Sequence, residues 1–122
     1  MIADTTFISD LIKERRRNVR GPATALISQH RDTIRTTIIS AAELAVMFKT
    51  SEGAWQWLAK WKIYQLHSGI AAAAADVERV LHVSGEQLGE NDNWIAGFAA
   101  YYREPLISHD AAFDQALAAC RT

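Results

Sequence analysis

The sequence contains little cysteine, little proline and no long apolar run. It has one cysteine, Cys120, and two prolines in 122 residues. A lone cysteine cannot form an internal disulfide, and it gives no sign of a zinc or redox motif. No segment approaches the roughly 18 consecutive apolar residues of a membrane span. Asp4 and Asp10 interrupt the stretch that a signal peptide would keep apolar. We therefore expect a cytoplasmic protein with no membrane association.

An excess of charge of either sign is also absent. The net charge is −1, yet residues 1–35 hold seven Lys and Arg against four acids, and the remainder holds six against ten. Total charge therefore favours neither the presence nor the absence of a nucleic-acid partner. The run KERRR at residues 13–17 makes Arg15, Arg16 and Arg17 candidates for contacting RNA phosphates. The commoner use of such a run is a solvated helix face.

What is present is the composition of an ordinary globular domain. The chain is 49% hydrophobic and 22% charged, and its length predicts a single domain over residues 1–122. A chain of this size buries about two-thirds of its unfolded surface, so a core without disulfides is feasible.

Apolar segments with strand and helix patterns alternate along the chain. This alternation predicts an α/β fold: three α/β/α layers with a small, mainly parallel sheet of about four strands. Strands are predicted at residues 1–3, 36–39, 80–83 and 105–108. Helices are predicted at residues 7–17, 23–31, 41–49, 53–66, 71–78, 93–104 and 111–120.

Acidic residues recur where an apolar segment ends or a helical pattern begins. Asp4 and Asp110 follow predicted strands, Glu43 lies early in a predicted helix, and Asp92 opens another. Sites in open parallel sheets form outside the carboxyl ends of the strands. The four acids could therefore converge at one sheet edge.

Helix capping is the alternative interpretation of each acid taken singly. Ser40 and Glu43 have the spacing of a capping box. Asp92 and Asp110 are suitable N-caps, and Asp4 either caps the first helix or precedes that cap by one residue.

Four converging carboxylates would repel one another unless protons or a divalent cation offset their charge. Oxygen-only ligands favour Mg²⁺ or Mn²⁺ over Zn²⁺. Such an ion can polarise a phosphodiester and activate water, so the pattern predicts phosphodiester hydrolysis.

Four ordered stretches resemble the PIN-domain ribonucleases, in particular the VapC-like toxins of bacterial toxin–antitoxin pairs. The stretches are ADTTFISDL, ISAAEL, NDNWIAGFA and PLISHDAAF, which begin at residues 3, 39, 91 and 105. The resemblance runs from Met1 to about Phe113. The chain departs from the family pattern in ending too soon for a further strand after the last helix.

The resemblance implies a Mg²⁺- or Mn²⁺-dependent endoribonuclease that forms a homodimer and is neutralised by a small antitoxin protein. It also implies the site residues. The catalytic and metal-binding acids would be Asp4, Glu43, Asp92 and Asp110, and Thr6 and Ser108 would orient them.

Three alternatives stay open at this point. The chain could be a non-catalytic PIN-like module that binds RNA or a protein. It could be an aspartyl-phosphate domain with Asp4 as nucleophile, although Thr6 stands where such sites place a second acid. The four acids could also be helix caps and nothing more.

Overall fold

The sheet is built from four short parallel strands in residues 1–108, the part of the chain that this computed structural model describes. Strand β1 pairs with β4, and β2 pairs with β3, in parallel. A parallel bridge between Ile2 and Arg35 joins the two pairs into the order β4-β1-β2-β3. This arrangement confirms the predicted small parallel sheet. The strands are β1 (Ile2–Ala3), β2 (Thr36–Thr37), β3 (Ile63–Tyr64) and β4 (Leu106–Ile107).

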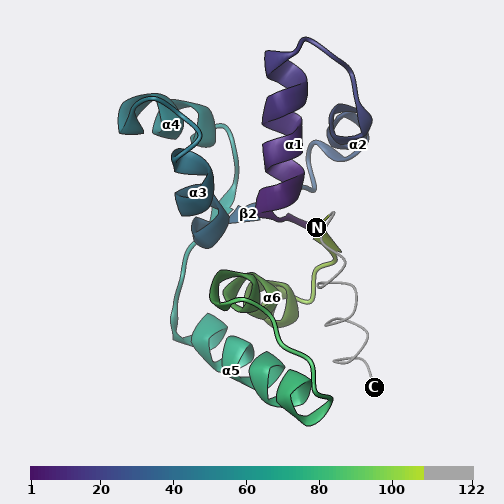
Figure 1. The fold of residues 1–122 in the computed structure, drawn as a ribbon, viewed down its shortest axis with the longest axis vertical. Coiled ribbons are helices and arrows are strands. Elements are labelled where there is room, and N and C mark those ends of the chain that lie inside the picture. Colours follow the sequence, from purple (N-terminus) through teal and green to yellow (C-terminus); the bar gives the residue numbers. More distant parts are fainter. Residues whose placement is uncertain (109–122) are drawn as a thin grey trace.

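Helices cover both faces of this sheet, as the predicted three layers require (Figure 1). Helices α1 to α4 lie on one side, and α5 and α6 pack against each other on the other. Strand β1 contributes to the packing on both sides of the sheet, because its successive side chains point to opposite faces. Ala3 packs in the cluster of α1, and Ile2 packs in the cluster of Ile70 and Phe98. The helices are α1 (Thr5–Arg16), α2 (Pro22–His30), α3 (Ile38–Ala45), α4 (Ser51–Leu58), α5 (Ser68–Val83) and α6 (Glu90–Tyr102).

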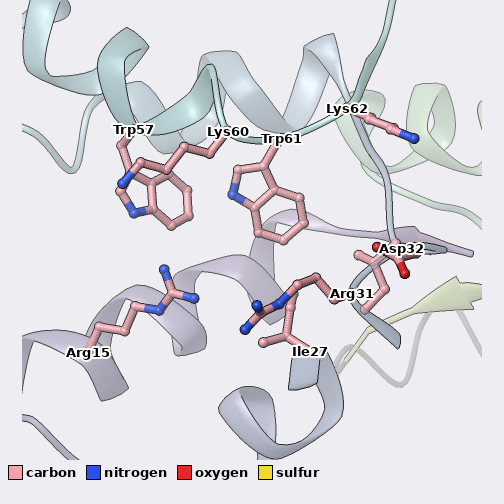
Figure 2. A pocket seen from close by; sticks show the side chains of 9 residues that line it. Arg15, Ile27, Arg31, Asp32, Trp57, Lys60, Trp61 and Lys62 are labelled. Atoms are coloured by element: carbon pink, nitrogen blue, oxygen red, sulfur yellow. The ribbon is translucent and has the colours of Figure 1, made fainter. Parts of the chain in front are cut away.

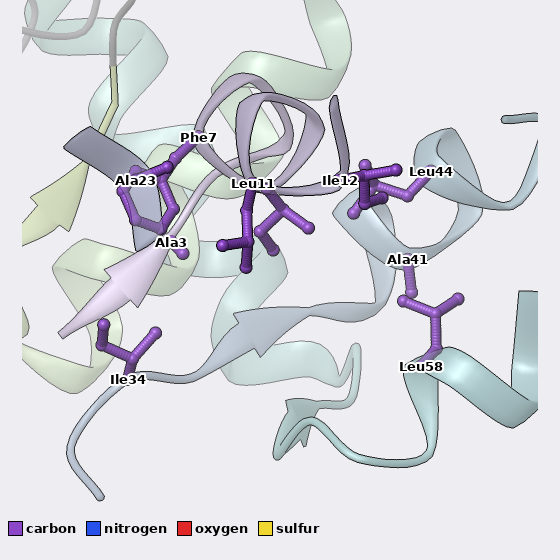
Figure 3. Packing of buried hydrophobic residues seen from close by; sticks show 10 residues of the cluster. Ala3, Phe7, Leu11, Ile12, Ala23, Ile34, Ala41, Leu44 and Leu58 are labelled. Atoms are coloured by element: carbon purple, nitrogen blue, oxygen red, sulfur yellow. The ribbon is translucent and has the colours of Figure 1, made fainter. Parts of the chain in front are cut away.

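Helix α1 carries the apolar stripe that its sequence predicts. Phe7, Ile8, Leu11 and Ile12 recur at helical spacing, and all four are buried. Figure 3 shows this stripe between β1 and the buried residues of α3 and α4. Burying each such side chain contributes about 1.5–3 kcal/mol to the free energy of folding. The stripe therefore holds α1 against the core.

Helix α2 is capped by a side chain of another helix. Its N-cap, Gly21, has no side chain to accept a hydrogen bond. Glu14 of α1 supplies the acceptor instead, at 3.1 Å from the Ala23 amide and 2.9 Å from the Thr24 amide. The hydrogen bond from the Thr24 amide is the main cause of the lowered pKa of Glu14. This contact ties the start of α2 to α1.

The predicted strand at 36–39 is two residues too long, because α3 begins at Ile38. The Thr37 hydroxyl accepts a hydrogen bond of 3.1 Å from the Ser40 amide and so caps that helix. The β-branched pair Ile38 and Ile39 therefore turns into a helix, against its strand propensity.

The predicted helix at 53–66 is wrong in its second half. Helix α4 ends at Leu58, and residues 63–64 form β3. Strand β3 exists because Thr36 and Thr37 pair with Ile63 and Tyr64. This pairing across the sequence overrides the local helical spacing of the aromatic residues.

The predicted strand at 80–83 is also wrong, because these residues are the last turn of α5. Buried Val77 and Leu81 continue the helical face of Ile70 and Ala74, whereas Val83 is 89% exposed. No helix in residues 1–108 is long and apolar enough to cross a membrane. The predicted helix at 111–120 lies outside the described residues.

Candidate active site

Asp4 lies where β1 ends and α1 begins, and its side chain is only 1% exposed. Its Oδ1 accepts a hydrogen bond of 2.9 Å from the Phe7 amide, so Asp4 is the N-cap of α1. The capping interpretation is therefore correct for this acid. Capping occupies one lone pair of a carboxylate that has about four, so it does not account for the whole environment of this acid.

Two hydroxyl groups hold the Asp4 carboxylate in one orientation. Thr6 Oγ1 donates to both oxygens of Asp4, at 2.9 and 3.0 Å. Ser108 Oγ donates to Oδ2 at 2.5 Å. Ser108 reaches Asp4 because β4 pairs with β1, and the Asp4 amide donates to the Ile107 carbonyl at 3.0 Å. The contacts of Thr6 and Ser108 are those that an orienting role requires.

Glu43 is linked to the same edge through Thr5. Thr5 Oγ1 donates a hydrogen bond of 2.7 Å to Glu43 Oε1, and it lies 3.1 Å from Ser40 Oγ. Because Thr5 follows Asp4 directly, its hydroxyl holds Glu43 next to the first turn of α1, which begins after Asp4. Residues 39 positions apart in sequence are thus tied together after β1.

Glu43 is not part of a capping box. The N-cap of α3 is Thr37, and Ser40 is the third residue inside the helix. Glu43 is the sixth residue of α3, in its second turn, and it is half-buried. The helix-cap interpretation of this acid is wrong, and so is its predicted place in the first turn. Its hydrogen bond to Thr5 gives it a different role.

Asp92 is not an N-cap either, because Gly89 occupies that position and α6 begins at Glu90. Asp92 is the third residue of α6 and is half-buried. Its charge lies at the positive end of the helix dipole, which favours an ionised carboxylate. Helix α6 packs against α3, the helix that carries Glu43.

Three acids of the predicted quartet, Asp4, Glu43 and Asp92, lie among the described residues. Within residues 1–108, no three His, Cys, Asp or Glu side chains group closely enough to hold a metal ion. Asp110, the fourth predicted acid, lies outside that range. What the structure shows is that Thr5, the residue after Asp4, is hydrogen-bonded to Glu43.

The donor chemistry around this pair fits a hard divalent cation. Asp4 and Glu43 present carboxylate oxygens, and the side chains bonded to them are the hydroxyls of Thr5, Thr6 and Ser108. Mg²⁺ and Mn²⁺ prefer oxygen ligands and keep several waters, so a site with few protein ligands suits them.

Sequence reasoning missed Thr5 and Ser40. The signal was available in the pair of threonines after Asp4, since consecutive residues at a helix start point in different directions. Thr6 turns back to Asp4, and Thr5 turns toward Glu43. No sequence pattern reveals that α3 lies next to Thr5.

The predicted RNA-binding arginines lie at the other end of α1. Asp4 and Arg15 are eleven residues apart, roughly 16 Å along a helix. Arg16 donates a hydrogen bond of 2.9 Å to the Met47 carbonyl, and its Cζ lies 5.6 Å from the centroid of the Phe48 ring. Arg16 therefore contacts the loop after α3 and stabilises it. Arg15 and Arg17 are exposed.

Comparisons with known proteins agree on the fold. The model of the PIN domain family matches residues 1–117. None of the curated proteins matches the chain. A structure of VapBC-1 from nontypeable Haemophilus influenzae is 23% identical with a TM-score of 0.73, over 96% of this chain and 91% of that chain.

Two further solved structures share the fold. VapBC2 from Rickettsia felis, bound to a DNA fragment from their promoter, is 18% identical with a TM-score of 0.72, over 93% of this chain and 90% of that one. A toxin–antitoxin complex from Klebsiella pneumoniae is 18% identical with a TM-score of 0.70, over 90% and 86%. At these identities the likeness establishes a common fold.

Proposed function

Because the chain belongs to the PIN domain family, we propose that it is an endoribonuclease that requires Mg²⁺ or Mn²⁺ and hydrolyses phosphodiester bonds of RNA. The observation that carries the proposal is the hydrogen bond to Glu43 from Thr5, the residue that follows Asp4. Hydroxyl groups donate hydrogen bonds to each of these two acids, and helix capping accounts only for Asp4.

The residues of the site divide into two roles. Asp4, Glu43, Asp92 and Asp110 would hold the metal ion. When bound, the ion polarises the phosphodiester, lowers the pKa of water and offsets charge on the leaving oxygen.

The hydroxyl groups keep the acids in place for that task. Thr6 and Ser108 donate to Asp4, and Thr5 donates to Glu43. Each such bond removes a rotational freedom of the carboxylate, so the acids stay in position without reorganising when RNA arrives. Asp4 is almost fully buried, and this burial shields its electrostatic interactions from bulk water.

We further propose that the protein is the toxin of a toxin–antitoxin pair and acts as a homodimer. The solved relative from Klebsiella pneumoniae is a toxin–antitoxin complex, which supports an antitoxin partner here. A short gene for a DNA-binding protein next to this one, whose product co-purifies with the chain and stops RNA cleavage, is the expected observation.

The direct test is cleavage of RNA by the purified protein. We expect cutting with Mg²⁺ or Mn²⁺, none in EDTA, and almost none for Asp92→Asn with metal present. Asp76→Asn is the matched control, because Asp76 is exposed on α5 and its ion pair within residues 1–108 is with Arg79. Unchanged cutting in EDTA would contradict the metal requirement. RNA that is bound but stays intact with metal would favour the non-catalytic module instead.

A further inference from the structure

A cavity of about 280 Å³ lies at the far end of α1, away from the acidic site. The residues around it come from the end of α1, the end of α2 and the segment from α4 to β3. Figure 2 shows Arg15 and Arg31 on one side of the space and the indoles of Trp57 and Trp61 on the other. Lys60 and Lys62 complete the positively charged part of the lining.

The lining carries four cations and one acid, Asp32. All four cations are exposed. The ion pairs found in residues 1–108 use other cations, namely the Met1 amine, Arg35 and Arg79. Within this part of the chain the cavity lining therefore carries an excess of positive charge, which Asp32 offsets only in part. Clustered cations of this kind attract a ligand with several negative charges.

The two indoles add a flat apolar surface to that charge. Trp57 and Trp61 have ring centroids 5.9 Å apart with planes inclined by 45°. Both are half-buried and pack on the core cluster of α1, so their positions are fixed while part of each ring stays open. Nucleic-acid bases stack on such rings whatever their sequence.

The cavity and the acidic site lie at opposite ends of the parallel strands. Ile34 lines the cavity just before β2, and Lys62 lines it just before β3, so it lies at the amino ends of these strands. Asp4 follows the carboxyl end of β1. A smaller hollow lined by Arg15, Trp57 and Phe48 adjoins the cavity along α1.

We propose that this cavity binds a single-stranded segment of RNA outside the acidic site. Its lysines and arginines contact phosphates, and its indoles stack on a base. The inference rests on RNA being the substrate of the proposed function. Roughly 16 Å of helix separates Arg15 from Asp4, which a single strand covers within the about 4–16 nucleotides that such surfaces bind.

Binding in EDTA tests this inference without cleavage. Anisotropy of a labelled single-stranded RNA of about 10 nucleotides would compare the wild type, Lys60→Gln/Lys62→Gln and Lys13→Gln/Arg79→Gln. The last variant removes the same charge from α1 and α5 outside the cavity. Each lost phosphate contact lowers the salt dependence of log K by about 0.7. We expect the magnitude of the slope of log K against log salt concentration to fall by about 1.4 for Lys60→Gln/Lys62→Gln and to stay unchanged for the control.

Tryptophan fluorescence reports stacking separately. RNA should quench the wild type, and Trp61→Phe should lose much of that quenching while it keeps an aromatic ring against the core. Trp55→Phe is the control, because Trp55 is 45% exposed and does not line the cavity. Quenching in Trp61→Phe equal to that in Trp55→Phe would contradict stacking at this cavity.

The inference would be overturned if Lys60→Gln/Lys62→Gln and the control Lys13→Gln/Arg79→Gln bound RNA with the same affinity and the same salt dependence. Wild-type protein that binds poly-glutamate of equal charge more tightly than RNA would also overturn it, because that outcome assigns the cavity to a protein partner. Failure of the proposed function is a different result. RNA would then bind the cavity with the expected slope, yet remain uncut with Mg²⁺ or Mn²⁺.

Discussion

The Thr5 hydroxyl donates a hydrogen bond of 2.7 Å to Glu43, and Thr5 is the residue that follows Asp4. This contact joins the first turn of α1 to the second turn of α3. It makes the position of Glu43 depend on the residue next to Asp4. The geometry of the acidic site is therefore set by hydroxyl groups that carry no charge themselves.

Removal of the Thr5 hydroxyl should weaken catalysis more than folding. Residues that orient metal-binding acids typically contribute about 10–100-fold to activity or metal affinity. We expect a loss in that range for Thr5→Ala, and near wild-type activity for Thr5→Ser, which keeps the hydroxyl. Cleavage rates over a range of Mn²⁺ concentrations provide the measurement. Equal rates for the alanine and serine variants would show that the hydrogen bond to Glu43 is irrelevant to the site.

Glu104 should make the fold sensitive to acid. Burial raises its pKa, but hydrogen bonds from Tyr64 and the Met1 amine outweigh that effect, so the pKa lies below its usual 4.5. A lowered carboxyl pKa stabilises the fold above the unfolded-state pKa, and this contribution is lost as pH falls through the folded-state value. Burial and the bond to Glu104 raise the pKa of Tyr64 to about 12, so Tyr64 stays a donor at neutral pH.

Melting temperatures of the wild type and Glu104→Gln provide the measurement. The wild type should be more stable at neutral pH, and its advantage should shrink as the pH falls below about 5. Glu86→Gln, at an exposed position, should keep the wild-type pH profile. A constant difference between the wild type and Glu104→Gln across this range would refute the assignment.

Gly97 lets α5 and α6 approach closely. A Cβ at this position would lie 2.8 Å from Ala74 Cβ and 2.9 Å from Ala74 Cα, so one helix would have to shift. Overpacking of this kind costs about 1–3 kcal/mol, and we expect that loss in the free energy of unfolding for Gly97→Ala. Ala100→Ser, at an exposed position of α6, should change it by less than about 0.5 kcal/mol. Urea denaturation of both variants is the check.

The parts of the fold that depend on local pattern were predictable. The stripe of α1 follows from helical spacing, and the short apolar runs before Asp4 and Ser108 predict the strands β1 and β4. The stripe and the two strands rest on residues close in sequence. Such features need no knowledge of long-range packing. The orienting role of Ser108 was implied by the resemblance to PIN domains, and its contact with Asp4 agrees with that role.

The errors arose where contacts between distant segments decide the structure. Strand β3 exists through its pairing with Thr36 and Thr37, which no local pattern at 63–64 reveals. Val80 and Val83 have strand propensity, but the burial of Val77 and Leu81 extends α5 through them. The N-cap of α3 is Thr37, which was not predicted, so α3 begins earlier than expected and Glu43 lies in the interior of the helix.

Asp4→Asn offers the most direct test of a divalent ion at Asp4 and Glu43. Asn is as good an N-cap as Asp, so the hydrogen bond from the Phe7 amide and the start of α1 should survive while the charge is lost. Calorimetric titration with Mn²⁺ should then show binding to the wild type and none to Asp4→Asn, while both proteins melt cooperatively without metal. Mn²⁺ binding of equal affinity to both proteins would contradict the account.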